Sequence, residues 1–543
     1  MNKKYTVTGV LVDVVNRQQY GAEITIENGR IAAIEKRPGI SFPYIIPGFT
    51  DAHVHIESSM LIPSRFARLA VKHGTVGVVT DPHEVANVAG IPGVEFMIAN
   101  GKTVPMQFFF GAPSCVPASP MEKSGAVITA DDVKQLLQRP EFWYLSEMMN
   151  FPGVIFDDQE VKAKLQSAVE MGKPVDGHAP GLMGDDLLKY VKSGISTDHE
   201  CSTREEAREK LALGMKVLIR EGSAARNFDN LIPLLKTYSE MLMFCTDDCH
   251  PDYLLRGHIN KLASRAVKAG YDLYDVLKVA CVNPVKHYRL PLGLLQPGDS
   301  ADFAVVENLE DFDVISVHIK GIPVFELGQL NFGTSAVVAP PFPFRSIHDK
   351  GQLKVVATGS RLNVIKAIDG ELITKWHTES CVQGEEIKSD PENDLLKLVL
   401  LNRYDNSPPV VAFIKGFGLK EGALACSVAH DSHHIIAVGC DDVSLDNALQ
   451  WVVENRGGMC SARKDTVRGV ALPFFGLMTD KNGEQVAADY EHLTREANDS
   501  GSTLSSPFMT LSFMALTVIP HLKINHNGLF DGNTFKNIEL FSC

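Results

Sequence analysis

The chain has 543 residues, of which 45% are hydrophobic and 22% are charged, a composition typical of soluble globular proteins. This length predicts about three to four domains rather than one. The formal net charge of -14 argues against a nucleic-acid backbone or an anionic membrane surface as the main partner.

The sequence carries no recognisable targeting or membrane-spanning signal. No long apolar segment follows the lysines at positions 3 and 4, and the apolar run 508–519 is too short to cross a membrane. The 10 cysteines are scattered without a C-x-x-C pair, which favours reduced thiols over a disulfide framework or a structural zinc site. We therefore expect a cytoplasmic protein with no nucleic-acid and no membrane partner.

Short strands are predicted on both flanks of a long central segment. Asn28-Gly29 is a strong hairpin-turn signal between two of them. The predicted strands are residues 10–14, 23–27, 30–34, 301–306, 314–319 and 322–324. We expect residues 1–45 and 291–340 to build one small β-sandwich, which would hold the two ends of the central segment close together.

The central segment, residues 46–290, alternates apolar strands with amphipathic helices. Gly74 and Gly172 end two of these helices, and Thr129 or Asp131 can cap a third. About eight β/α units of this kind predict an α/β protein built on a parallel (β/α)₈ TIM-like barrel. A doubly wound sheet is the alternative, but it would not usually need so many units.

Residues 341–543 are expected to form a separate C-terminal α+β domain. Pro340-Pro341-Phe342-Pro343 marks the boundary as a linker signal. Predicted strands at 410–414 and 435–438 alternate with predicted helices at 445–454 and 485–497.

His53 and His55 stand at the end of the first predicted barrel strand. Alternate residues of a strand point to the same side, so both imidazoles can converge on one metal ion. Two surface histidines are the alternative interpretation.

The later strands end in Asp81-Pro82-His83-Glu84, Glu147, Asp176-Gly177-His178, Asp198-His199-Glu200, Arg220-Glu221-Gly222-Ser223 and Asp247-Asp248. Since catalytic groups lie at the carboxyl ends of barrel strands, this series favours a metal site.

The chemistry of these side chains suits a pair of divalent cations. The expected metal ligands are His53, His55, Glu147, His178, His199 and Asp247. Nitrogen and oxygen donors without a thiolate favour Mn²⁺, with Fe²⁺ or Zn²⁺ possible, and disfavour structural zinc. Glu147 is expected to bridge two ions, which together acidify a water near neutral pH. Asp247 can accept the proton of the resulting hydroxide as it attacks.

Several long stretches resemble the adenine deaminases, a family within the amidohydrolase superfamily. The superfamily resemblance rests on the His-x-His, the strand-end histidines and Asp247. The narrower resemblance rests on residues 47–60 (PGFTDAHVHIESSM), 81–84 (DPHE), 147–149 (EMM), 219–227 (IREGSAARN), 245–248 (CTDD) and 430–434 (HDSHH). It covers essentially the whole chain. Many amidohydrolases bridge their metals with a carbamylated lysine, and the resemblance implies that Glu147 takes that place here.

The resemblance implies hydrolysis of adenine to hypoxanthine and ammonia, in which hydroxide attacks C6 and N1 gains a proton. We predict Asp247 as the proton shuttle and Glu84 as the acid that serves N1. Glu57 and Glu221 remain open for the second role. Each of these glutamates has the alternative of orienting a ligand histidine.

Further residues are assigned to the substrate or left open. The expected substrate contacts are His83, Glu221, Ser223 and Asp248. His83 can instead be a metal ligand, Asp248 can instead cap the following helix, and Arg220 is a plausible pocket residue. The cluster His430, His433 and His434 can hold a metal or reach the active-site mouth, but we favour a polar turn before the strand at 435–438.

Two other functions fit part of this pattern. The same fold and metals can serve an amidohydrolase acting on another purine or a cyclic amide, because one barrel supports many chemistries. A catalytically inactive barrel acting as a scaffold is the other hypothesis, but every expected metal ligand is present. A homo-oligomer, in the simplest case a dimer, is expected only because dimers are the commonest assembly.

Overall fold

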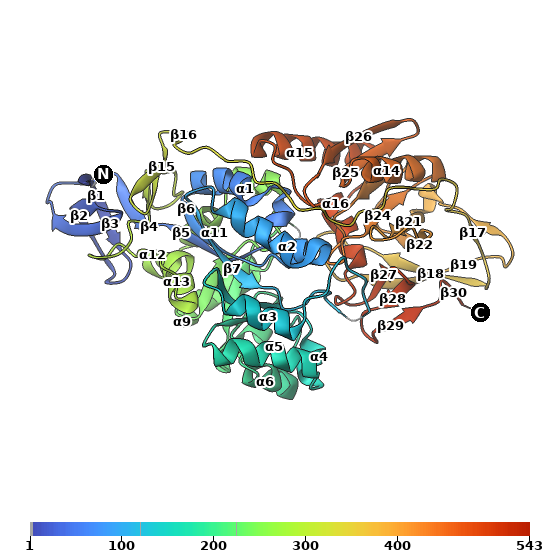
Figure 1. Cartoon of the computed structure of the whole chain (residues 1–543), viewed down its shortest axis with the longest axis horizontal. Helices are drawn as coiled ribbons and strands as arrows, with labels where there is room; N and C mark the ends of the chain where they lie inside the picture. Colours follow the sequence, from blue (N-terminus) through green and yellow to red (C-terminus); the bar gives the residue numbers. More distant parts are fainter. Residues whose placement is uncertain (1–3, 120, 224, 543) are drawn as a thin grey trace.

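The computed structural model describes residues 4–119, 121–223 and 225–542 (Figure 1). Residues 1–3 and 543, which the first and last predicted domains include, lie outside the described residues. A small β-rich part, a barrel and a C-terminal domain follow one another along the long axis of the molecule (Figure 1).

The two flanks of the chain share one sheet. Its strands, in the order β16-β15-β14-β13-β4-β1-β2-β3, are β1 (Lys4–Asp13), β2 (Gln18–Glu27), β3 (Arg30–Lys36), β4 (Tyr44–Pro47), β13 (Phe303–Val306), β14 (Val314–Ile319), β15 (Ile322–Glu326) and β16 (Gln329–Leu330). β4 joins the flanks, because it pairs with β1 on one side and with β13 on the other. The hairpin turn at Asn28-Gly29 folds back onto the second flank, where Ala301 N–H donates to Gly29 O at 2.9 Å. The curled sheet encloses its own apolar core, which includes Leu11, Ile24 and Phe303. The predicted limit at residue 45 falls inside β4.

Eight parallel strands form the predicted TIM-like barrel, which is confirmed. They are β5 (Phe49–Val54), β6 (Thr75–Thr80), β7 (Gln107–Ala112), β8 (Phe142–Met148), β9 (Val175–Gly177), β10 (Thr197–Asp198), β11 (Lys216–Arg220) and β12 (Leu242–Cys245). Ser196 N–H donates to Val175 O at 2.9 Å and links the β9 and β10 ends. Asp247 N–H donates to His53 O at 2.9 Å and closes β12 against β5. The ends of the first and last strands are therefore neighbours.

The barrel helices are α1 (Pro63–Ala70), α2 (His83–Gly101), α3 (Ala130–Leu137), α4 (Phe151–Ile155), α5 (Gln159–Glu170), α6 (Gly184–Lys192), α7 (Arg204–Ala212), α8 (Phe228–Leu231), α9 (Leu235–Tyr238), α10 (Pro251–Arg256), α11 (Ile259–Lys268), α12 (Leu273–Leu277) and α13 (Asn283–Tyr288). Thr129, rather than Asp131, caps α3, because its hydroxyl accepts the Asp132 N–H at 3.2 Å. The sequence did not predict α2. This helix is kinked at Gly90, whose φ of 61° is non-helical, and it contains Pro92.

The C-terminal domain is built on a nine-stranded sheet with helices, as the predicted α+β domain requires. The sheet contains β18 (Arg361–Lys366), β19 (Lys375–Ser380), β21 (Leu396–Leu401), β22 (Val410–Lys415), β23 (Ala423–Cys426), β24 (Ile435–Gly439), β25 (Gly458–Arg463), β26 (Thr466–Ala471) and β30 (Phe541–Ser542). Smaller sheets hold β17 (Val355–Val356), β20 (Glu386–Ile387), β27 (Leu522–Asn525), β28 (Gly528–Asp531) and β29 (Lys536–Ile538). The helices are α14 (Asp442–Glu454), α15 (Gly483–Asp499) and α16 (Pro507–Ser512). Arg256 of α10 donates to Glu491 of α15 at 2.6 Å and so connects this domain to the barrel.

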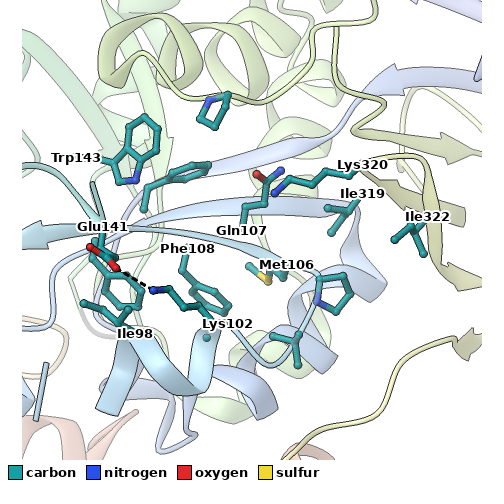
Figure 2. Close-up of a pocket in the computed structure, with 16 residues that line it drawn as sticks. Ile98, Lys102, Met106, Gln107, Phe108, Glu141, Trp143, Ile319, Lys320 and Ile322 are labelled. Carbon is teal, nitrogen blue, oxygen red and sulfur yellow. Dashed lines mark hydrogen bonds and ion pairs between the residues drawn. The ribbon is translucent and has the colours of Figure 1, made fainter. Parts of the chain in front are cut away.

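A cavity of about 450 Å³ lies at the amino end of the barrel strands (Figure 2). Trp143, at the start of β8, lies at one end of its lining and Ile322, from the small sheet, at the other (Figure 2). Lys102 and Glu141 form an ion pair of 2.9 Å within it. This cavity is therefore at the opposite end of the barrel from the predicted metal ligands. Within the described ranges, no helix combines the length and hydrophobicity needed to cross a bilayer.

Candidate active site

The first group of predicted ligands meets where β5 and β12 end side by side. His53 Nε2 and His55 Nε2 lie 3.2 Å apart. Both face Asp247 Oδ1, at 3.5 Å and 3.1 Å respectively. All three residues are buried. Because barrel closure makes these strand ends neighbours, three ligand atoms converge on a point that one cation can occupy.

Glu147, at the end of β8, faces two sets of histidines. Its Oε1 lies 3.2 Å from His55 Nε2. Its Oε2 lies 2.7 Å from His178 Nδ1 and 3.3 Å from His199 Nε2. The two oxygens of one carboxylate thus point to two separate imidazole groups, which is the arrangement that a bridging ligand needs.

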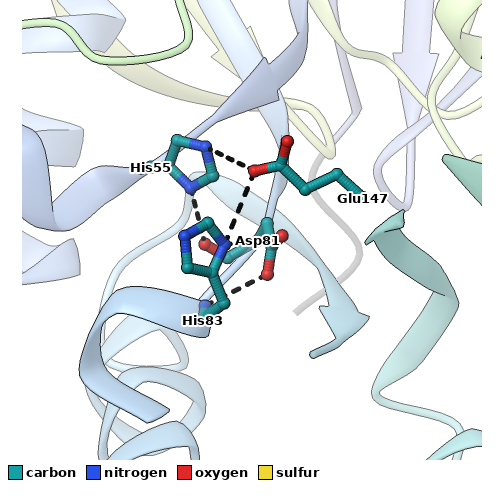
Figure 3. A group of neighbouring side chains, drawn as sticks. All are labelled: His55, Asp81, His83 and Glu147. Carbon is teal, nitrogen blue, oxygen red and sulfur yellow. Dashed lines mark hydrogen bonds and ion pairs between the residues drawn. The ribbon is translucent and has the colours of Figure 1, made fainter. Parts of the chain in front are cut away.

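His83 lies beside the first histidine group (Figure 3). Its Nδ1 is 2.9 Å from Asp81 Oδ2 and 3.6 Å from Glu147 Oε1, and its ring centroid is 4.6 Å from that of His55. Asp81 therefore orients His83, in the manner of a carboxylate that supports a ligand histidine. The other ring nitrogen, Nε2, is 3.6 Å from Glu84 Oε1, so His83 lies between the metal ligands and Glu84.

The predicted ligand set fits divalent cations. In the described part of the chain, His53 Nδ1 and His178 Nε2 are buried without a hydrogen-bond partner. Burial opposes ionisation of Glu147, but His178 and His199 outweigh it and hold the pKa of this carboxyl well below its usual range. An ionised carboxylate among imidazoles, with no thiolate in the set, is the donor chemistry of Mn²⁺, Fe²⁺ or Zn²⁺ sites.

Arg220, at the end of β11, holds two carboxylates. Its Nη1 donates to Asp247 Oδ2 at 2.7 Å, and its Nη2 donates to Glu200 Oε2 at 3.2 Å. Burial opposes the charge on Asp247, but Arg220, His53 and His55 keep its pKa well below the usual range. Glu200 was not predicted as a site residue, although its position directly after His199 was a signal. Its Oε1 lies 3.5 Å from His199 Nε2.

The C-terminal domain contributes polar side chains to the site. His430 Nδ1 lies 2.6 Å from Glu84 Oε1, and His433 hydrogen-bonds the other oxygen of the same carboxylate. His430 stacks on Phe513, with ring centroids 4.5 Å apart. Burial opposes protonation of His430, but the charge of Glu84 outweighs it and raises the pKa to about 9. The favoured interpretation of this cluster as only a polar turn is therefore wrong, because the turn lies against the barrel mouth.

A small cavity of about 30 Å³ remains between the metal ligands and the C-terminal domain. Its apolar wall consists of Met149, Leu372, Phe513, Leu516 and Ile519. The volume suffices for only a water or two, so these side chains must shift when a purine-sized molecule enters. Phe513, Leu516 and Ile519 belong to the apolar run 508–519, so this run forms much of the wall of the site.

Some predicted residues are not brought to this cavity. Glu221 pairs with Arg265, on the outer side of β11. The hydroxyl of Ser223 accepts the His250 N–H at 2.8 Å. Glu57 Oε1 accepts a backbone N–H at 3.2 Å, and burial raises the pKa of its carboxyl to about 7. Of the predicted substrate contacts, only His83 and Asp248 line the cavity, as does Glu84.

A buried lysine supports the strand end that carries His199. Lys210 Nζ donates to Ala179 O at 2.7 Å and to Glu206 Oε1 at 2.8 Å, and it forms an ion pair with Asp198. Asp198 and Lys210 are completely buried and Glu206 is nearly so. This lysine therefore neutralises two carboxylates immediately behind the site.

Replacing Lys210 with methionine is expected to destabilise the protein by about 3–5 kcal/mol, because two buried carboxylates lose their counter-charge. Differential scanning calorimetry should show a lower Tm. Lys268→Met is a matched control, since its ion pair with Asp311 is exposed, and it should leave the Tm unchanged. A Lys210→Met protein that melts with the wild type would contradict the assigned role.

Comparison with known proteins finds matches both to the barrel segment and to the C-terminal domain. The model of the amidohydrolase family matches residues 44–324, and that of the adenine deaminase C-terminal domain matches residues 371–536. An adenine deaminase of Methanosarcina mazei is 48% identical, over 99% of this chain and 100% of that protein. An adenine deaminase of Sulfurovum is 49% identical over 98% of both chains, and one of Salinibacter ruber is 48% identical over 100% of both.

Proposed function

The chain belongs to the adenine deaminases of the amidohydrolase family, and from this premise we propose that its barrel site hydrolyses adenine to hypoxanthine and ammonia at a pair of metal ions. The observation that carries the proposal is the position of Glu147. Its two carboxylate oxygens face two different groups of histidines, at 3.2 Å and 2.7 Å.

Two divalent ions would be held by His53, His55, His178, His199 and Asp247, with Glu147 between them. Mn²⁺ suits these nitrogen and oxygen donors best, and Fe²⁺ or Zn²⁺ would be accepted by the same set. Such ions lower the pKa of water and supply a nucleophile near neutral pH.

Asp247 is proposed as the proton acceptor. Arg220 keeps its carboxylate ionised despite burial, so that it can take a proton from the attacking water. During the reaction C6 of adenine gains an oxygen, and the bond from C6 to the exocyclic nitrogen breaks. Asp247 would return the proton to that nitrogen, which leaves as ammonia. The second proton of the water would leave the C6 oxygen as the carbonyl forms, and it would replace the proton delivered to N1.

Glu84 is proposed as the group that delivers a proton to N1. It lines the cavity, whereas Glu57 and Glu221 do not. Its carboxylate is held by His430 and His433, which outweigh burial and keep its pKa well below the usual range. The proton therefore rests on His430, whose pKa is raised to about 9, and Glu84 would relay it to N1. Asp248 is buried at the same cavity and is proposed to bind the purine edge.

The apolar wall, which the C-terminal domain supplies except for Met149 of the barrel, is proposed to cover the purine ring and exclude water. Exclusion of water strengthens the interactions of the charged groups that surround it. A homodimer and a cytoplasmic location are further proposals. The dimer rests on dimers being the commonest assembly, and the location rests on the scattered cysteines.

Chelation of the purified protein is expected to abolish adenine deamination, and added Mn²⁺ should restore it. Release of ammonia and the change in purine absorbance measure turnover. Protein that loses its metal to the chelator and still deaminates adenine would contradict the proposed centre. Protein that binds two ions without converting adenine would instead support an amidohydrolase of another purine or a cyclic amide.

A further inference from the structure

A second cavity lies at the carboxyl end of the barrel, outside the ring of metal ligands. It encloses about 230 Å³ between the segments that follow β11 and β12 and the start of α11. Four cationic side chains line it, namely Arg226, Arg256, Lys261 and Arg265, with Glu221 as the one acidic residue of its described lining. Carboxylates pair with two of these cations, and the other two carry the positive charge that is available to a ligand.

Two of these cations lack an acidic partner. Among the described residues, neither Arg226 nor Lys261 forms an ion pair with a carboxylate. Arg226 donates instead to neutral acceptors, the Gly222 carbonyl at 3.1 Å and the Tyr253 hydroxyl at 2.6 Å. Arg256 and Arg265, in contrast, each pair with two carboxylates.

Tyr253 brings two of the guanidinium groups together. The centre of the Arg226 guanidinium lies 4.9 Å from the Tyr253 ring centroid, and that of Arg256 lies 5.3 Å from it. Asp252 and Glu491 neutralise Arg256, so Arg226, which pairs with no carboxylate among the described residues, is the guanidinium beside this ring that is available to an anion. The side-chain arrangement therefore favours an anionic ligand over a neutral one.

The start of α11 borders the cavity through His258, Lys261 and Leu262. The dipole of this ten-residue helix favours an anion near its amino end. Gly257 brings the Lys261 side chain close to the loop, because a Cβ at Gly257 would lie 2.1 Å from Lys261 Cγ.

The position in the barrel points to the kind of anion. β11 and β12 are the seventh and eighth strands, and the loops after these two strands, with a nearby helix amino terminus, are a recurrent phosphate-binding place in TIM-like barrels. We propose that this cavity binds the phosphate group of a small phosphorylated ligand. The group is either free phosphate or the monoester of a nucleotide, and the chemistry of recognition is the same for both.

The cavity is separate from the proposed active site but shares its strand ends. Glu221 lines the cavity, while its neighbour Arg220 donates to Asp247 in the metal site. Likewise Thr246 lines the cavity, directly before Asp247. Successive residues of a strand point to opposite sides, so the end of β11 contributes Arg220 to one site and Glu221 to the other.

The experiment is isothermal titration of the full-length, metal-loaded protein with orthophosphate and, separately, with adenosine 5′-monophosphate at constant ionic strength. Saturable binding with one site per chain is expected for at least one of them. Tighter binding of the nucleotide would assign the site to phosphorylated nucleosides, and equal or tighter binding of orthophosphate would assign it to the phosphate group alone.

Variants connect the binding to this cavity. Arg226→Gln and Lys261→Gln should each weaken it at least about tenfold, since a hydrogen bond to a charged group contributes about 1.5–3 kcal/mol. Lys375→Gln removes an exposed lysine of β19 and should leave the affinity unchanged. Thermal unfolding establishes that each variant is folded. The absence of saturable binding, or binding that Arg226→Gln and Lys261→Gln both leave intact, as for phosphate held only by the metals, would overturn the proposal.

Discussion

Asp247→Asn is expected to lower kcat for adenine by about 10²–10⁴-fold, the usual contribution of a positioned acid or base. The carboxylate lies 3.1 Å from His55 Nε2 and 2.7 Å from Arg220 Nη1, so it can accept a proton beside the proposed nucleophile. An asparagine has the same shape but cannot accept that proton at neutral pH. Steady-state kinetics with ammonia as the readout measure the loss.

Metal content distinguishes a lost base from a lost ligand. Asparagine retains one oxygen that can face the first histidine pair, so with excess Mn²⁺ the variant should still take up metal while turnover stays low. Metal analysis and thermal unfolding of the same preparation serve as controls. A variant with near-normal kcat would refute the role of Asp247, and one rescued fully by excess Mn²⁺ would reduce that role to metal binding.

The metal-ligand half of the site could be predicted because it follows from regular features of the chain. An H-x-H at a strand end places two imidazoles on one side, and closure of a barrel brings His53 next to Asp247, although 194 positions separate them in the sequence. Neither step depends on the details of loops. The alternation of side chains along a strand also indicated that Glu221 lies outside the barrel, and the substrate contact predicted for it ignored this. Since Arg220 points into the barrel, Glu221 must point outward, where it pairs with Arg265.

The other half depends on how domains and loops dock, which periodicity does not encode. His430 reaches Glu84 across 346 positions, and Phe513 stacks on that histidine. Nothing in the local sequence of either segment indicates which surface it meets. The helix α2 was missed for a local reason, since Gly90 and Pro92 are residues that usually end a helix, yet here the helix is kinked and continues.

Glu147→Gln is expected to cause the largest loss of metal. The carboxylate lies 2.7 Å from His178 Nδ1 and 3.2 Å from His55 Nε2, so a neutral amide would remove a negative charge from between both proposed ions. Since even residues that only support a ligand affect affinity about 10–100-fold, loss of this bridge should weaken metal retention at least about 100-fold. Metal analysis after dialysis, with kcat measured before and after added Mn²⁺, tests this.

The matched control is Glu95→Gln, which removes a half-buried carboxylate that pairs with Arg139 and is not part of the lining of the active-site cavity. It should change neither metal content nor turnover. If Glu147→Gln retained two ions through dialysis, another carboxylate would have to bridge them. Glu200 would be the next candidate, because its Oε1 lies 3.5 Å from His199 Nε2 and 3.7 Å from His178 Nδ1. Arg220 argues against that role, because its Nη1 and Nη2 bind both carboxylate oxygens of Glu200, whereas it binds only Oδ2 of Asp247 and leaves Oδ1 facing the histidines.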